Sequence, residues 1–284
     1  QTPKDVKYTF TEATDLQLVN KMMPGTPNPY ARVDTLKYKG FTAGENRQVR
    51  CPAGMAVAFR TNSSTISVKT VYSAEGNAYT TNNTTAVSYR GYDLYIRKDG
   101  KWVYAASGCK SPDKSGDNLV LINNMERKEK ECLMYLPEYA EVYSVKIGVE
   151  EGASIKGFQP FKHRIVVHGS SFTQGVSTSR SGMAYSAQLE RHTGPQVINF
   201  GCSGNCKMQP YFCDVLCDVE ADAFVFDAFS NPNAKLIEER LVGFIDRHVE
   251  AHPGTPLIFQ ETIYREARNF DLSYDARERG KQDR

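Results

Sequence analysis

Three short loops rich in serine, asparagine and glycine each follow an apolar run of the sequence, and these loops could carry chemistry. They are residues 169–171, 201–205 and 230–233. Short apolar runs that end at small residues are typical of strands buried in a parallel sheet. The carboxyl ends of parallel strands lie at one edge of their sheet, where ligands bind in open α/β proteins. We therefore expect the three loops to converge on one site.

Acyl transfer is the reaction that such a site could support. It requires a hydroxyl nucleophile and hydrogen-bond donors aimed at the carbonyl oxygen that becomes negative. A serine of the first loop, Ser170 or Ser171, could be the nucleophile, and two backbone N–H groups with one carboxamide from the loops could be the donors. Each of these residues taken alone could also be an ordinary turn residue. The expected convergence of three loops favours an active site.

Other catalytic and phosphate-binding motifs are missing from the sequence. Gly169 and Gly175 do not have P-loop spacing, and Val176 stands where the P-loop lysine would be. No predicted strand is followed by G-x-G-x-x-G, and the second glycine of G-x-S-x-G is missing from residues 169–173. We therefore expect no bound cofactor.

The composition is that of a globular chain with enough apolar residues to form cores. The 284 residues are 40% hydrophobic and 24% charged, and their net charge is +2. This balance does not favour nucleic acid or a membrane surface as partner, and no apolar run is long enough to span a bilayer. Because the chain begins at Gln1 without a methionine, we expect a removed leader or a trimmed chain, and a secreted or periplasmic protein.

The odd number of cysteines leaves at least one thiol outside any intramolecular pairing. The seven are Cys51, Cys109, Cys132, Cys202, Cys206, Cys213 and Cys217. The last four have C-x3-C…C-x3-C spacing, which is poor for a structural zinc site, so we expect core residues and no metal centre. Cys109 and Cys132 flank a polar loop, and a disulfide between them is plausible in an oxidising compartment.

The first half of the chain predicts a β-rich domain. Residues 1–30 are expected to be an irregular arm, because three prolines fall within residues 22–30. Short alternating segments with turn residues between them then predict strands. These are residues 55–60, 65–71, 86–89, 93–97, 101–106, 119–122 and 141–149. Asp99-Gly100 predicts a tight hairpin. The pattern favours a β-sandwich or jelly roll over residues 1–155.

Alternating strands and helices predict an α/β domain over residues 156–284, with a parallel sheet and right-handed crossovers. The predicted strands are residues 165–167, 196–200, 223–227 and 256–260. The predicted helices begin near residues 183, 207, 233 and 272. The helix over 233–251 is the clearest, because its apolar residues recur close to every 3.6 positions. The chain stops within a charged, uncapped helix over 276–284, which we interpret as a C-terminal truncation.

The loop sequences resemble the conserved blocks of the SGNH (GDSL-type) hydrolases. Residues 169–175, GSSFTQG, are similar to the first block, G-D-S-[IL]-T-x-G, with Ser170 in place of the aspartate. Residues 199–204, NFGCSG, are similar to the second block, whose glycine donates an oxyanion-hole N–H. Asn231 is the best match to the asparagine of the third block, although its G-x-N-D context is degenerate.

A bacterial two-domain subgroup of this family offers the most extensive resemblance. Its N-terminal β domain carries G-x-D-L-Y, which stands here as residues 91–95, and residues 179–185 also resemble that subgroup. The resemblance implies a jelly-roll-like β-sandwich followed by a flavodoxin-like SGNH α/β domain. It also implies catalytic roles for Ser171, Gly201 and Asn231.

The fifth family block, D-x-x-H, is missing from residues 1–284, and it would supply the base and its orienting acid. His168 immediately precedes the serine loop, at the end of the predicted strand that begins at residue 165, and is expected to be packed, while His248 and His252 are expected at the surface. We therefore expect the base to lie beyond Arg284. Without a base a serine hydroxyl is a weak nucleophile, so residues 1–284 alone should be nearly inactive.

Two functions follow from these observations. The first is a serine esterase that removes acetyl or other short acyl groups from a small molecule or a carbohydrate, as the resemblance implies. The alternative is a carbohydrate-binding protein with an inactive SGNH-like domain, in which some of the sixteen tyrosines, with Trp102, stack on sugar rings.

Overall fold

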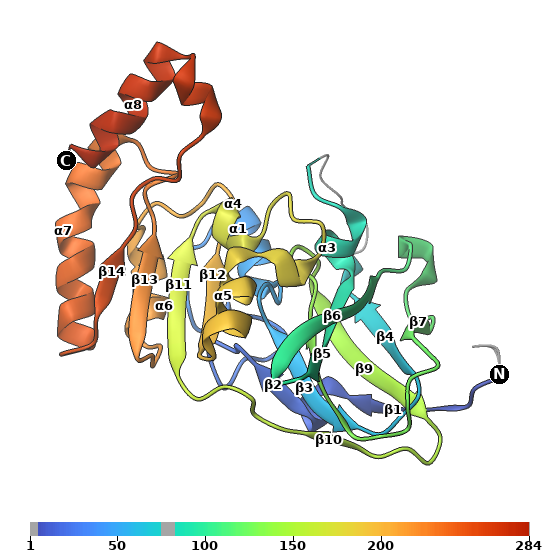
Figure 1. Ribbon diagram of the computed structural model, residues 1–284. Helices are drawn as coiled ribbons and strands as arrows, with labels where there is room; N and C mark the ends of the chain where they lie inside the picture. Colours follow the sequence, from blue (N-terminus) through green and yellow to red (C-terminus); the bar gives the residue numbers. More distant parts are fainter. Residues whose placement is uncertain (1–4, 75–82, 284) are drawn as a thin grey trace.

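A β-rich half and a parallel α/β half lie side by side in the computed structural model, which describes residues 5–74 and 83–283 (Figure 1). The β-rich half contains two antiparallel sheets, in the orders β1-β9-β4-β7 and β10-β3-β8-β5-β6, with β2 also paired to β3. The strands are β1 Tyr8–Glu12, β2 Gln17–Val19, β3 Ala56–Thr61, β4 Ile66–Tyr72, β5 Tyr92–Lys98, β6 Lys101–Gly108, β7 Leu119–Ile122, β8 Lys130–Tyr135, β9 Val142–Glu150 and β10 Ile155–Gly157. Alternate side chains of both sheets, including Val57, Phe59, Val68 and Ile147, share one buried core.

This architecture confirms a β-rich first half, and several details differ from the prediction. Residues 86–89 form helix α3 (Ala86–Arg90), because the Thr85 hydroxyl accepts the Ser88 N–H and caps a helical turn. The expected irregular arm contains β1 and β2. Helix α1 (Ala43–Arg50), β8 and β10 were not predicted. Thr42 and Glu45 form a complete capping box at the start of α1, which is a signal that the sequence carries.

The Asp99-Gly100 hairpin is confirmed. Both residues have positive φ, 51° and 76°, as a two-residue turn between β5 and β6 requires.

The predicted Cys109–Cys132 disulfide is wrong, since all seven cysteines are free. Cys132 on β8 lies opposite Ile96, whereas Cys109 follows Gly108, which lies opposite Tyr92. The two positions are therefore about five residues apart along β5, roughly 16 Å, which is beyond the reach of a disulfide.

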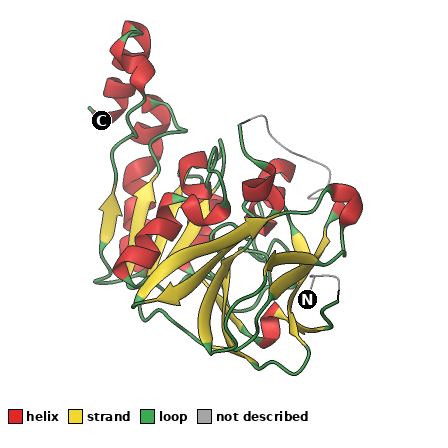
Figure 2. Cartoon of the chain, turned by 45° about the vertical axis from the view of Figure 1, so that its right-hand side comes forward, coloured by secondary structure: helices red, strands yellow, loops and turns green. Residues whose placement is uncertain are grey.

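The second half contains four parallel strands, as predicted, and their order in the sheet is β12-β11-β13-β14. They are β11 Arg164–Gly169, β12 Gln196–Gly201, β13 Ala223–Asp227 and β14 Leu257–Phe259. The helices are α4 Ser171–Gln174, α5 Tyr185–Thr193, α6 Pro210–Cys217, α7 Ala234–Ala251 and α8 Leu272–Gln282. Short 3₁₀ helices are η1 Ala13–Asp15, η2 Pro112–Lys114, η3 Ser181–Met183 and η4 Glu266–Asn269. Helix α8 projects beyond the carboxyl ends of the strands (Figures 1 and 2).

The core of the α/β half lies between the sheet and the helices α6 and α7. Phe224 and Phe226 of β13 pack with Phe212 of α6 and Phe244 of α7. His248 lies in this core with no exposed surface, so its predicted surface position is wrong. The predicted domain boundary at residue 155 remains a prediction.

Within residues 5–74 and 83–283, no helix is both long and apolar enough to cross a membrane.

Candidate active site

The three polar loops converge at the carboxyl edge of the parallel sheet, as expected. The Cys202 N–H donates to the Gly169 carbonyl at 2.9 Å, and the Ser203 N–H donates to Gln174 Oε1 at 2.8 Å. The Cys206 N–H donates to Asn231 Oδ1 at 3.1 Å and thereby joins the second loop to the third. Each loop is therefore fixed to its neighbour by a hydrogen bond from a backbone N–H.

Ser171 is the first residue of α4, which follows directly after β11. The hydroxyl of Ser170 caps this helix by accepting the Phe172 N–H at 3.4 Å, and Ser170 is only 1% exposed. Gly175 ends the helix with a φ of 118°, a conformation that strongly favours glycine. The first N–H of a helix has no intrahelical acceptor, so the backbone N–H of Ser171 is available as a donor. Of the two serines, Ser171 is the half-buried one that faces a cavity.

Gly201 is buried and is not among the residues that line the Ser171 cavity. Its N–H donates to Asn199 Oδ1 at 2.8 Å, so this donor already has a partner. A Cβ at Gly201 would lie 2.1 Å from the Gln174 nitrogen, and glycine is therefore needed for the close approach of β12 to α4. The predicted role of Gly201 as an oxyanion donor does not fit this geometry.

Gly204, three residues further on, lines the same cavity as Ser171 and is exposed. Its φ is 73°, and apart from its two chain neighbours no described residue has an atom within 4 Å of a Cβ built there. No hydrogen bond from the Gly204 N–H is found among the described residues. Sequence reasoning chose the first glycine of the loop and missed this one. The Gly204-Asn205 pair was the available signal, since such pairs mark turns with positive φ.

Asn231 follows β13 and is half-buried. Because its Oδ1 accepts the Cys206 N–H, the amide nitrogen is left as the free hydrogen-bonding group. Asn231 does not line the cavity that contains Ser171.

The cavity beside Ser171 has a volume of about 440 Å³, and both halves of the chain form its walls. Ser171, Gln174 and Gly204 come from the α/β half, while Arg47 and Tyr139 are among the residues contributed by the β-rich half. Helices α1, α3 and α4 all contribute to its wall, through Gln48, Tyr89 and Gln174 among others. The sequence did not identify the walls from the β-rich half.

The G-x-D-L-Y motif holds the segment after α4 against the β-rich half. The buried carboxylate of Asp93 accepts the Gly182 N–H at 2.9 Å and lies 3.2 Å from Arg180 Nε. The Tyr95 hydroxyl donates to the same carboxylate at 3.2 Å. Burial raises the pKa of Asp93 to about 6, although the Arg180 charge opposes this shift. A Cβ at Gly91 would lie 2.5 Å from two carbonyl oxygens, which explains the first residue of the motif.

Glu138, also from the β-rich half, packs against the end of α4. Its buried carboxylate accepts hydrogen bonds from the hydroxyls of Ser88 at 2.5 Å and Thr178 at 3.2 Å. A Cβ at Gly175 would lie within 2.6 Å of this carboxyl group, so Gly175 is required by packing as well as by φ. Burial raises the pKa of Glu138 well above its usual value.

None of the five histidines lines the Ser171 cavity. His168 is fully buried, with Nδ1 2.9 Å from the Phe200 carbonyl, and it packs between the rings of Phe200 and Phe212. Burial lowers its pKa to about 4. His168 is therefore a neutral packed residue, as the sequence suggested, and not the base.

We expect His168 to weaken folding as the pH falls from about 6.5 to about 4. Between these pH values His168 binds a proton in the unfolded state, where its pKa is about 6.5, but stays neutral in the folded state, where its pKa is about 4. Protonation therefore favours the unfolded state. His168→Asn, whose amide can still donate to Phe200, should therefore lose less stability than the wild type over this range. Urea unfolding at several pH values measures the difference. His192→Asn, at an exposed position, is the control and should keep the wild-type pH profile. Equal pH dependence of His168→Asn and wild type would contradict the expectation.

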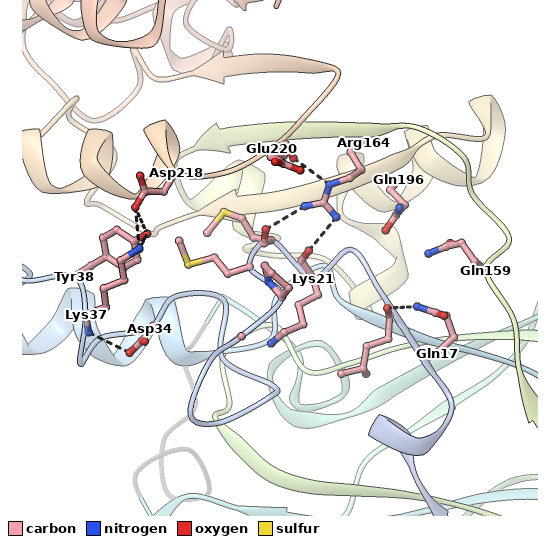
Figure 3. Close-up of a pocket in the computed structure, with 15 residues that line it drawn as sticks. Gln17, Lys21, Asp34, Lys37, Tyr38, Gln159, Arg164, Gln196, Asp218 and Glu220 are labelled. Atoms are coloured by element: carbon pink, nitrogen blue, oxygen red, sulfur yellow. Dashed lines mark hydrogen bonds and ion pairs between the residues drawn. The ribbon is translucent and has the colours of Figure 1, made fainter. Parts of the chain in front are cut away.

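A larger cavity, of about 880 Å³, lies at the opposite edge of the sheet, beside Arg164 and Gln196 at the starts of β11 and β12 (Figure 3). Its cationic side chains already have partners. Lys37 pairs with Asp218 at 3.0 Å, and the Arg164 guanidinium donates to the carbonyls of Lys21 and Met22. We interpret it as a junction between the N-terminal segment and the sheet.

In the described part of the chain, no group of three or more His, Cys, Asp or Glu side chains is arranged to hold a metal ion. Cys202, Cys206 and Cys213 are buried core residues, as expected.

A serine at the carboxyl edge of a parallel sheet, beside glycine and asparagine loops, is the arrangement of a hydrolase-type α/β domain. Residues 6–155 match the family model described as GxDLY, the N-terminus of SGNH-hydrolase-type esterases. Residues 162–283 match the GDSL-like lipase/acylhydrolase family. The chain belongs to the GDSL-like lipase/acylhydrolase family and carries the GxDLY N-terminal domain.

Solved structures with the same fold include a Bacteroides ovatus protein assigned to the GDSL-like lipases. It is 40% identical with a TM-score of 0.92, and the match covers 98% of this chain and 81% of that protein. A family two carbohydrate esterase from Cellvibrio japonicus is 11% identical with a TM-score of 0.59, over 98% of this chain and 86% of that one. Salicylyl-acyltransferase SsfX3, from a tetracycline biosynthetic pathway, is 18% identical with a TM-score of 0.62, and the match covers 93% of this chain and 72% of that protein. No curated protein matches this chain.

Proposed function

We propose that this protein is a secreted or periplasmic serine esterase that removes acetyl or other short acyl groups from carbohydrates. One observation carries the proposal: the half-buried hydroxyl of Ser171 faces a cavity that it shares with the exposed backbone of Gly204. Membership of an acylhydrolase family and the likeness of the fold to a carbohydrate esterase support the reaction and the substrate class.

In this reaction Ser171 Oγ attacks the ester carbonyl carbon, and its proton passes to a base. The carbonyl oxygen becomes negative and accepts hydrogen bonds from the N–H groups of Ser171 and Gly204. Asn231 Nδ2 is the third donor that we propose: Asn231 lies outside the cavity wall, but its side chain is joined to the Gly204 loop through the Cys206 N–H. The C–O bond to the alcohol then breaks as the alcohol takes up the proton, and water later releases the acid from Ser171. Gly204 replaces Gly201 in this scheme, because the Gly201 N–H is already bound by Asn199.

We propose that the base is a histidine outside residues 1–284. The support is that every histidine present lies away from the Ser171 cavity. His163 is exposed beside Asp222, and His252 Nε2 lies 2.8 Å from the Leu216 carbonyl.

The full-length protein is expected to release p-nitrophenol from p-nitrophenyl acetate faster than buffer does. Release at the buffer rate would overturn the proposal and favour a carbohydrate-binding protein.

Asn231→Ala is expected to lower kcat about a hundredfold with little change in KM, because an oxyanion donor acts in the transition state and not on the bound ester. Steady-state kinetics of the full-length protein measure both constants. Asn233→Ala is the control: it removes the cap of α7, where Asn233 Oδ1 accepts the Leu236 N–H, and should leave kcat within a fewfold. An effect of Asn231→Ala confined to KM would show that it is not an oxyanion donor.

A further inference from the structure

Arg47 gives the Ser171 cavity a positive charge. It is the one charged residue among the described residues that line the cavity, and its side chain is exposed. No hydrogen bond or ion pair of the Arg47 guanidinium is found among the described residues. The other polar groups on the wall, such as Gln48, Tyr139 and Ser203, are uncharged. The wall therefore has one free cation and, within its described part, no carboxylate to neutralise it.

The backbone of Arg47 is held in a fixed position relative to the candidate oxyanion loop. Helix α1 begins at a capping box, in which the Thr42 N–H donates to Glu45 Oε2 at 2.8 Å. The next residue after Arg47, Gln48, donates from Nε2 to the Ser203 carbonyl at 2.9 Å and accepts from Asn205 Nδ2 at 2.9 Å. The residues on both sides of Gly204 are thus bonded to the residue that follows Arg47.

Helix stability is the competing explanation for a basic residue here, because Arg47 and Arg50 both lie in the last turn of α1. Arg50 serves a structural purpose, since its Nε pairs with the buried carboxylate of Glu141 at 3.0 Å. Arg47 has no such partner in the described part of the chain and lines the cavity instead. The two arginines are therefore in different situations, and only Arg47 is placed to meet a substrate.

We propose that Arg47 binds a carboxylate on the substrate, and that the substrate is an acyl ester of an acidic sugar such as a uronic acid. This inference rests on the proposed esterase function and deepens it. A guanidinium presents two parallel N–H groups that match the two oxygens of a carboxylate, and the partly enclosed cavity strengthens that pairing relative to open solvent. A neutral acetylated sugar has no carboxylate with which the Arg47 guanidinium could pair.

Binding to a non-cleaving protein tests the inference independently of catalysis. The ligands are an acetylated methyl glucuronoside and the acetylated methyl glucoside with the same acetyl position. Calorimetric titration of full-length Ser171→Ala should show the uronate bound about tenfold more tightly. Adding Arg47→Gln should remove the preference for the uronate and leave the Kd of the glucoside within about twofold. Adding Arg47→Lys instead should keep part of the preference for the uronate. Arg127→Gln, at an exposed arginine paired with Glu150, should keep all of it.

Equal affinity for the two ligands in Ser171→Ala, or an equal loss for both on adding Arg47→Gln, would overturn the inference. Binding of neither ligand would also overturn it. Failure of the wild-type protein to hydrolyse either ester is a separate result. It would overturn the esterase function, while an Arg47-dependent preference for the uronate would still support the carboxylate site.

Discussion

Ser171→Ala is expected to lower hydrolysis of p-nitrophenyl acetate by the full-length protein by about a thousandfold or more. The reason is that the hydroxyl forms the acyl bond itself, so its removal ends the covalent route and leaves only the residual effect of binding and of the oxyanion donors. Among the described residues, Ser170 is 1% exposed and its hydroxyl caps α4, while Ser203, which also lines the cavity, shares a hydrogen bond with the Tyr139 hydroxyl at 2.8 Å. Initial rates at saturating and limiting ester measure kcat and kcat/KM.

Ser170→Ala is the matched comparison, because it removes the neighbouring hydroxyl from the same loop. Loss of an N-cap costs about 1 kcal/mol of helix stability, so this variant should retain at least about a tenth of the activity. The two substitutions therefore separate the nucleophile from its neighbour. A Ser171→Ala protein as active as wild type would remove Ser171 from the mechanism, and a larger loss from Ser170→Ala would move the nucleophile to that residue.

The α/β half could be predicted from the sequence because its signals are local. Strand β13 has the predicted bounds, and α7 differs by one residue, since Asn233 is the cap that precedes it. The β-rich half was harder because its strands are defined by distant partners. Strand β8 pairs with β3 and β5, and its last four residues are buried. It begins with two charged residues, Lys130 and Glu131, so the sequence pattern does not indicate a buried strand. No neighbouring residue of the sequence reveals that pairing.

In the candidate site, too, some features follow from local sequence and others from contacts between distant residues. Ser171 and the convergence of the three loops follow from the ends of parallel strands, which the sequence predicts. The choice between Gly201 and Gly204 depends on whether a particular N–H is already bound, and only the fold shows that Asn199 binds the first. Arg47 reaches the cavity from helix α1, and Tyr139 reaches it from the loop between β8 and β9. Their positions depend on how the two halves pack, which no local pattern encodes.

Arg32 shows how that packing supports the site, and it underlies the second large effect that we expect. Strand β12 is at the edge of its sheet, so the carbonyls of Asn199 and Gly201 point away from β11. The Arg32 guanidinium is 1% exposed and donates to both, at 3.1 and 2.8 Å. It also donates to the carbonyls of Cys51 and Gln48, at 2.9 and 2.8 Å. One buried cation therefore joins the edge of the parallel sheet to the end of α1.

Arg32→Leu is expected to lower the free energy of unfolding by about 3–5 kcal/mol, because removing one partner leaves buried carbonyls unsatisfied at about 1–3 kcal/mol each, partly offset by relaxation. Urea unfolding with an unchanged m-value measures the loss. Arg47→Leu, an exposed arginine without a partner among the described residues, should change stability by less than about 0.5 kcal/mol. Arg32→Lys keeps the charge but cannot donate to all four carbonyls, so its loss of stability should lie between those of Arg32→Leu and Arg47→Leu. If Arg32→Leu costs no more than Arg47→Leu, the guanidinium does not hold β12 to α1, and the fixed position of Arg47 beside Gly204 must rest on Gln48 alone.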